Sequence, residues 1–84
     1  MPYNLIVCRS LTYAQKAAAA LERSGIPAHI MRTPTEFSTG GCSYSVKIPQ
    51  KRRIDAKETL RRIGITPVRV LQSDGDGSYR EVST

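Results

Sequence analysis

The residues with the clearest chemical potential lie in segment 38–43, whose sequence is STGGCS. Cys42 follows Gly40 and Gly41, which accept positive φ and allow successive backbone N–H groups to point at one anion. Three hydroxyl-bearing residues add hydrogen-bond donors to this loop: Ser38, Thr39 and Ser43. Because the thiolate is the reactive form of cysteine, a loop that stabilises an anion predicts a nucleophilic Cys42. The alternative is a glycine turn with an inert cysteine, and the residue types alone favour neither interpretation.

The other residues that suit catalysis or metal binding are isolated. Cys8 ends an apolar stretch and is interpreted as a core residue, or alternatively as a resolving thiol that forms a reversible disulfide with Cys42. His29 has no second histidine and no acidic neighbour at ligand spacing, so we predict no metal site. Glu36 precedes the Cys42 loop and is interpreted as a loop carboxylate rather than an acid or base.

A basic segment is the second feature that suggests a function. The chain has 13 Lys and Arg residues against 7 Asp and Glu residues, a formal net charge of +6. The excess concentrates in one stretch: Lys51, Arg52, Arg53, Lys57, Arg61 and Arg62. Such a stretch attracts nucleic acid or an acidic protein, although a solvated helix face is the more common explanation. RNA-binding sheets also need neighbouring exposed aromatic residues, which Tyr3 and Tyr44 match only weakly.

Hydrophobic spacing places these residues on alternating strands and helices. Residues 3–8, 27–32, 43–48 and 66–71 have the composition or alternation of strands. Residues 11–24 form an alanine-rich helix capped by Ser10, and a second helix starts at Asp55, with Glu58 completing a capping box, or near Gln50. We therefore predict an α+β, ferredoxin-like βαββαβ fold, in which a four-stranded antiparallel sheet carries both helices on one face.

This topology makes further predictions about the whole chain. Residues 1–71 form a single domain, and residues 72–84 form a polar, flexible tail. The first strand lies antiparallel to the third, so Cys8 and Cys42 lie near the same edge of the sheet, whereas Lys51 and Arg53 lie at the other end. The outer strands, the second and the fourth, are candidates for pairing between chains in a homodimer.

Length and composition exclude some classes of protein. A chain of 84 residues has room for a shallow site rather than a deep cofactor pocket, so we expect neither a cofactor nor an enzyme with converging catalytic groups. No secretory signal or stretch long enough to span a membrane is visible. Two cysteines are too few for a disulfide framework, and we therefore expect a cytoplasmic protein with reduced thiols.

The chain resembles the selenium/sulfur carrier-like family of small domains over residues 3–71. The resemblance rests on a Y-x-L-I-V strand before the helix-starting Ser10, on G-I-P before the second strand, and on the P-x-E-x-S segment from Pro34 that leads to Cys42. Two features differ from the family pattern. Family members often have Cys-Gly, whereas here the glycines precede Cys42 and Ser43 follows it, and Cys8 stands where an apolar or aromatic residue is usual.

The resemblance implies that Cys42 carries sulfur or selenium covalently, as a persulfide or selenopersulfide. The protein would be a carrier without turnover of its own, with sulfur or selenium donor and acceptor proteins as partners. The alternative function is a small basic binding or regulatory module for nucleic acid or an acidic protein, in which Cys42 is structural. A third hypothesis is a redox switch that closes a disulfide between Cys8 and Cys42.

Overall fold

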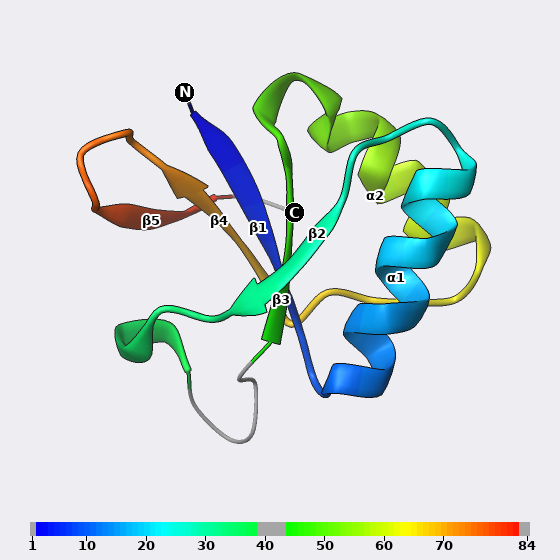
Figure 1. Cartoon of the computed structure of the whole chain (residues 1–84), viewed down its shortest axis with the longest axis horizontal. Helices are drawn as coiled ribbons and strands as arrows, with labels where there is room; N and C mark the ends of the chain where they lie inside the picture. Colours follow the sequence, from blue (N-terminus) through cyan, green and yellow to red (C-terminus); the bar gives the residue numbers. More distant parts are fainter. Residues whose placement is uncertain (1, 39–43, 83–84) are drawn as a thin grey trace.

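The computed structural model describes residues 2–38 and 44–82 of the 84-residue chain (Figure 1). Its elements follow in chain order as β1 (Tyr3–Cys8), α1 (Leu11–Arg23), β2 (His29–Arg32), the 3-10 helix η1 (Thr35–Phe37), β3 (Tyr44–Pro49), the 3-10 helix η2 (Gln50–Arg52), α2 (Arg53–Arg62), β4 (Arg69–Ser73) and β5 (Tyr79–Val82).

The strands form one sheet in the order β2-β3-β1-β4-β5, and every neighbouring pair is antiparallel. Both α-helices cover one face of this sheet, here called the helix face (Figure 1). The first four strands and the two helices have the predicted βαββαβ order. The predicted number of four strands is wrong, because β5 forms within the segment that we expected to be a flexible tail. As a result β4 is an inner strand, and of the two predicted outer strands only β2 remains at an edge.

The helix face is buried because α1 can lie close to the sheet. Ala14, Ala17 and Leu21 of α1 are fully buried and pack in one cluster with Ile6 of β1 and Leu60 of α2. The short alanine side chains allow a close approach, and their spacing of three and four residues keeps them on one side of the helix. The predicted helix is therefore confirmed, and Ser10 caps it by accepting a hydrogen bond from the backbone N–H of Tyr13 at 3.3 Å.

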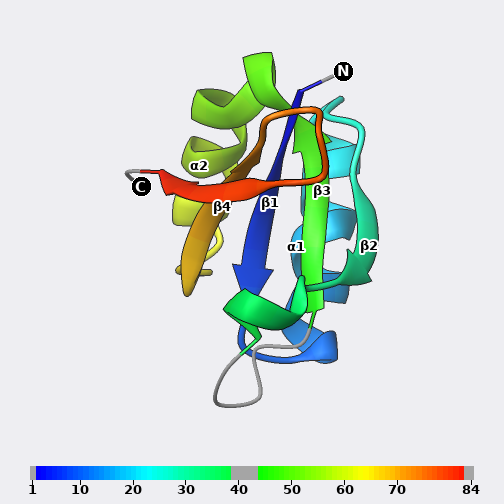
Figure 2. The ribbon, with the colours of Figure 1, turned by 90° about the vertical axis from the view of Figure 1, so that its left-hand side faces the viewer.

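The opposite face of the sheet, here called the second face, is also buried. Leu5, Val7 and Leu71 form its cluster, and each has an exposed fraction of 0%. Phe37 of η1 and Tyr79 of β5 pack against this cluster, and Figure 2 shows β5 crossing in front of β4 and β1 on that side. An antiparallel sheet that is apolar on both faces must be covered on both. The fifth strand and η1 therefore complete the core.

The second helix begins earlier than the cap at Asp55 predicts. The chain enters η2 directly after Pro49 and continues into α2 at Arg53, which agrees better with the alternative start near Gln50. Asp55 lies in the first turn of α2, where its carboxylate accepts a hydrogen bond from Arg52 Nε at 3.1 Å. Asp55 thus anchors an arginine instead of capping the helix.

Candidate functional site

Cys8 lies in a row of three residues that crosses the sheet at one end. Tyr44, the first residue of β3, pairs with Cys8 on one side and with Arg32 of β2 on the other. We call this end of the sheet, where β1 ends and β3 begins, the thiol end. Cys8 is only 2% exposed and belongs to the helix-face cluster, and its Sγ lies 3.6 Å from the carbonyl oxygen of Ile6. The interpretation of Cys8 as a core residue is confirmed.

Most of the predicted loop lies outside the described residues. This applies to Thr39, Gly40, Gly41, Cys42 and Ser43. Ser38 is described and half-buried, and its backbone N–H donates to the carbonyl of Thr35 at 3.2 Å at the end of η1. The described chain resumes at Tyr44, opposite Cys8, so the predicted antiparallel pairing of the end of the first strand with the start of the third is confirmed.

Two arginines lie at the thiol end and were not singled out from the sequence. The guanidinium of Arg32 lies 5.5 Å from the ring centroid of Tyr44. Arg9 directly follows Cys8, and its guanidinium lies 5.1 Å from the ring centroid of Tyr13. Both side chains are exposed. In the sequence, the only feature that marks these arginines is their position: Arg32 ends one strand and Arg9 directly follows another. The sheet topology then brings the ends of these two strands to the same end of the sheet. Arg9 and Arg32 therefore place two positive charges at the thiol end.

The start of the predicted basic segment lies at the opposite end of the sheet. This segment starts after Pro49, which pairs with Tyr3 at the start of β1. With a rise of about 3.4 Å per residue, β3 separates this segment from the thiol end by roughly 17 Å. Arg52 and Arg61 are engaged in ion pairs with Asp55 and Glu58. Charge counting along the sequence therefore overestimates the number of cations available to a partner.

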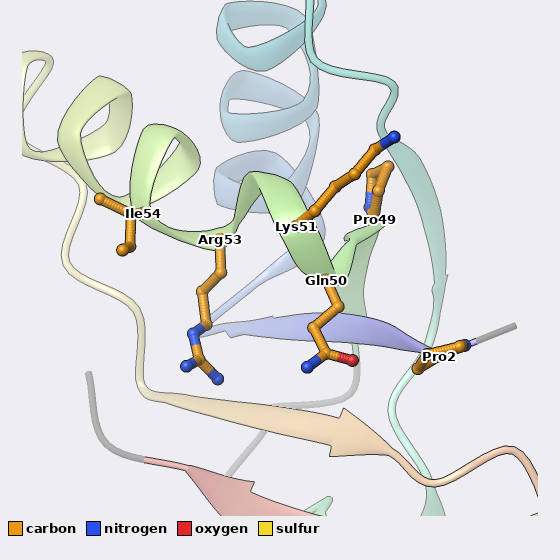
Figure 3. A pocket seen from close by; sticks show the side chains of 6 residues that line it. All are labelled: Pro2, Pro49, Gln50, Lys51, Arg53 and Ile54. Carbon is orange, nitrogen blue, oxygen red and sulfur yellow. The ribbon is translucent and has the colours of Figure 1, made fainter.

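The start of the basic segment surrounds a cavity of about 490 Å³. Its lining comprises Pro2, Pro49, Gln50, Lys51, Arg53 and Ile54. In Figure 3 the side chains of Gln50 and Arg53 extend to the same side of the chain, whereas that of Lys51 extends to the other. Arg53 Nη1 is buried without a hydrogen-bond partner in the described part of the chain. This arrangement suits an anionic group, which the guanidinium prefers as a partner.

A family model described as "Putative Se/S carrier protein-like" matches residues 3–72 of the chain. The chain belongs to this family. The match begins at the first residue of β1, ends within β4 and spans the position of Cys42, so it confirms the resemblance seen in the sequence. No curated protein and no solved structure matches the chain.

The fifth strand lies beyond the residues that match the Se/S carrier-like family, and a pair of tyrosines joins it to the matched part. The hydroxyl oxygens of Tyr3 and Tyr79 lie 2.6 Å apart, and the rings meet edge to face with centroids 6.2 Å apart. The hydrogen bond to Tyr3, together with burial, raises the pKa of Tyr79 to about 12. Lys47 Nζ lies 4.3 Å from the Tyr3 ring centroid, so the aromatic face of Tyr3 is occupied.

The sheet of this family member is not an RNA-binding platform of the type considered from the sequence. Tyr3 packs against the second-face cluster and Tyr44 against the helix-face cluster, so the two rings lie on opposite faces. Recognition of single-stranded RNA on a sheet needs stacked aromatics on one open face. The weak match of Tyr3 and Tyr44 to that pattern therefore has no support in the sheet.

The remaining polar candidates do not converge. His29 lies on the edge strand β2 and Glu36 in η1, and both are exposed. Within residues 2–38 and 44–82, no group of three His, Cys, Asp or Glu side chains is placed to hold a metal ion. The helices in this part of the chain are all too short or too polar to cross a membrane.

Proposed function

We propose that the protein is a carrier that holds sulfur or selenium on Cys42, as a persulfide or selenopersulfide, and passes it to a partner protein. The observation that carries this proposal is the family match, which spans Cys42. The burial of Cys8 supports the choice between the two cysteines. A carrier thiol must be reached by both a donor and an acceptor, and a side chain that is 2% exposed within a packed core does not meet that need.

The proposed reaction is an exchange between sulfur atoms. The Cys42 thiolate attacks the terminal sulfur of a donor persulfide, so that a new S–S bond forms at Cys42 while the S–S bond of the donor breaks. The donor leaves as a thiolate, which takes up the proton that Cys42 released. An acceptor thiolate then attacks the terminal sulfur in the same way and regenerates Cys42. Replacing the terminal sulfur by selenium leaves this balance unchanged, and no external oxidant or cofactor is needed.

The positive charge of the thiol end supports the reactive form of Cys42. Cations near a thiol favour the thiolate and lower its pKa from the ordinary value of about 8.5. Arg9 follows Cys8 at the end of β1, and Arg32 lies opposite Tyr44, where the described chain resumes after the loop. Further donors from the loop would also stabilise the thiolate. They are the backbone N–H groups at Gly40 and Gly41 and the hydroxyl groups of Ser38, Thr39 and Ser43. We place this exchange in the cytoplasm, where thiols remain reduced.

Loading of each cysteine variant tests the proposal. The purified protein is treated with inorganic polysulfide, and the sulfur bound to each cysteine is located by peptide mass spectrometry. We expect wild type and Cys8→Ala to gain sulfur on Cys42, and Cys42→Ser to gain none while its circular dichroism spectrum stays unchanged. Comparable loading of the Cys42→Ser protein would refute the carrier function. A cross-linked peptide that joins Cys8 to Cys42 through a disulfide would instead indicate the redox switch.

A second candidate function is a basic binding or regulatory module in which Cys42 is structural. The cavity lined by Lys51 and Arg53 favours it, because Arg53 Nη1 is buried there without a partner in the described residues. Binding of this kind to nucleic acid weakens steeply with salt and does not require a thiol. Salt-dependent RNA binding that is equal in wild type and Cys42→Ser, together with absent sulfur loading, would favour this function over the carrier.

A further inference from the structure

A groove of about 470 Å³ lies between α1 and the end of α2, on a part of the surface that the predicted basic segment does not include. Its lining comprises Tyr13, Lys16, Ala19, Arg23, Ile63, Gly64 and Ile65. We propose that this groove docks an acidic polypeptide segment that carries an apolar side chain. The preference for an acidic segment follows from the groove itself. The further statement that this segment belongs to a protein which exchanges sulfur or selenium with Cys42 rests on the proposed function.

One ridge of α1 gives the groove its length. Tyr13, Lys16, Ala19 and Arg23 are three or four residues apart, so their side chains lie one above another on the helix surface. At about 1.5 Å per residue, the ridge from Tyr13 to Arg23 is roughly 15 Å long, which matches four or five residues of extended chain or three turns of helix. Ala19 has only a methyl group, so the middle of the ridge is low and leaves space for a side chain of the partner.

The two walls of the groove expose apolar surface. Tyr13 is 37% exposed and Ile63 is 47% exposed, and both are among the few large hydrophobic side chains of the described residues that reach solvent. Such side chains, gathered around a hollow and bordered by charges, are typical of an interaction site. Ala19 lines the same groove as Tyr13 and Ile63, so an apolar side chain of a partner seated there meets apolar surface.

The charge of the groove selects an acidic partner. Lys16 and Arg23 lie along it, the lining contains no Asp or Glu, and neither cation takes part in an ion pair among the described residues. Lys16 Nζ and the guanidinium of Arg9 lie 5.9 and 5.1 Å from the ring centroid of Tyr13, so the aromatic wall is itself flanked by cations. Carboxylates across such a surface increase the rate of association and fix the register of binding.

A polypeptide fits this surface better than a nucleic acid. Single-stranded nucleic acids bind to successive aromatic side chains on which the bases stack. The groove provides one aromatic ring, Tyr13, and its other apolar surface comes from Ala19, Ile63 and Ile65. Aliphatic surface of this kind suits a Leu or Ile side chain of a partner.

The groove also leads toward the thiol end. Its Tyr13 end lies in the first turn of α1, which begins three residues after Cys8. Both views in Figures 1 and 2 place the start of α1 beside the end of β1 and the start of β3, and η2 at the opposite end of the sheet. A partner bound along α1 therefore reaches the thiol end directly, whereas one bound at Lys51 and Arg53 is separated from it by the length of β3.

A titration followed by NMR tests the groove in the full-length chain. The Cys42→Ser protein, labelled with ¹⁵N, is titrated with a synthetic twelve-residue peptide in which Glu residues surround two Leu residues. We expect the backbone signals of Tyr13, Lys16, Ala19 and Ile63 to shift, and affinity to fall as salt rises. Peptides with Gln in place of Glu, or Ala in place of Leu, should bind more weakly.

Matched charge variants identify the surface that binds. The double substitution Lys16→Gln with Arg23→Gln should weaken peptide binding roughly fivefold or more, because two exposed charge contacts are lost. The control, Lys51→Gln with Lys57→Gln, removes the same net charge from the other basic surface and should have little effect. Equal weakening in both variants, shifts confined to residues 50–54, or no binding would overturn the proposal. So would groove shifts produced more strongly by a single-stranded RNA oligonucleotide than by the acidic peptide.

Sulfur loading of the same variants separates this inference from the carrier function. Inorganic polysulfide needs no docking surface, so Lys16→Gln with Arg23→Gln should load Cys42 as wild type does. Peptide binding without any loading of wild-type Cys42 would contradict the carrier function and leave the groove in place. Loading without peptide binding would contradict the groove alone.

Discussion

Replacing Leu71 by alanine is a direct test of the buried second face. Leu71 is 0% exposed, pairs with Leu5 across β1 and β4, and belongs to the same cluster as Val7. Removal of three buried carbon atoms costs about 2.4 kcal/mol as lost transfer free energy. The cavity left behind raises the cost to roughly 3 to 4 kcal/mol. In an open four-stranded sheet the same side chain would be partly solvated, and its truncation would cost only about 1 kcal/mol.

Urea unfolding followed by circular dichroism at neutral pH measures this difference. For a domain of this size, a loss of 3 kcal/mol corresponds to a decrease in Tm on the order of 12 to 24 °C. Val68→Ala is the matched control, because Val68 directly precedes β4 but is 44% exposed, and we expect it to change stability by less than about 1 kcal/mol. If Leu71→Ala costs no more than this control, β5 and Phe37 do not cover the second face in solution.

Three further predictions concern the elements that build the sheet and its first helix. Folding raises the pKa of Tyr79 from 10.0 to about 12, so the stability from its hydrogen bond with Tyr3 is fully present below pH 10 and is lost as pH rises toward 12. In urea unfolding measured across that range, Tyr79→Phe should lose less free energy of unfolding with rising pH than wild type does. The same dependence of the unfolding free energy on pH in both proteins would contradict this. Ser10→Ala removes the hydroxyl that accepts from Tyr13 N–H at 3.3 Å and should cost about 1 kcal/mol, with Ser10→Thr as the conservative control. Gly25→Ala meets no atom within 4 Å but imposes a side chain on a φ of +81°, so thermal unfolding should show a loss of roughly 1 to 2 kcal/mol from backbone strain alone.

The elements that local periodicity specifies were predicted from the sequence. The helix α1 was predicted because small residues at intervals of three and four favour a helix that packs closely on a sheet. The alternation of β3 is likewise retained, with Val46 and Ile48 on the helix face. The order of the first four strands followed from these elements and from the short connections between them.

The fifth strand was missed because its four residues carry little local signal. Tyr79–Val82 has two charged residues at its centre and follows a stretch rich in Asp and Gly. Its stability comes from pairing with β4 and from placing Tyr79 over the second face. Residues 3–8 nevertheless contained an indirect signal, since a strand with apolar residues on both faces requires a cover on each.

The candidate site was only partly predictable, because its cations are distant in sequence. Arg9 and Arg32 are separated by a helix and a strand, and only the pairing of β1 and β2 with β3 brings them to the same end of the sheet. The contiguous run after Pro49 was conspicuous in the sequence, yet it lies at the far end. Linear clustering therefore identified the basic residues of one helix but not the charge that surrounds the thiol end.

The pairing of the basic residues determines which of them are available to a docking partner. Arg52 donates both to Asp55 and to the backbone carbonyl of Gly25, so it holds the start of α2 against the end of α1. Arg61 is paired with Glu58 in the same helix. Such cations contribute little to an encounter, because their charge is already balanced nearby. Lys16 has no acidic partner in the described chain and lies on α1, which begins at the thiol end, so a partner attracted there approaches the thiol end as it docks.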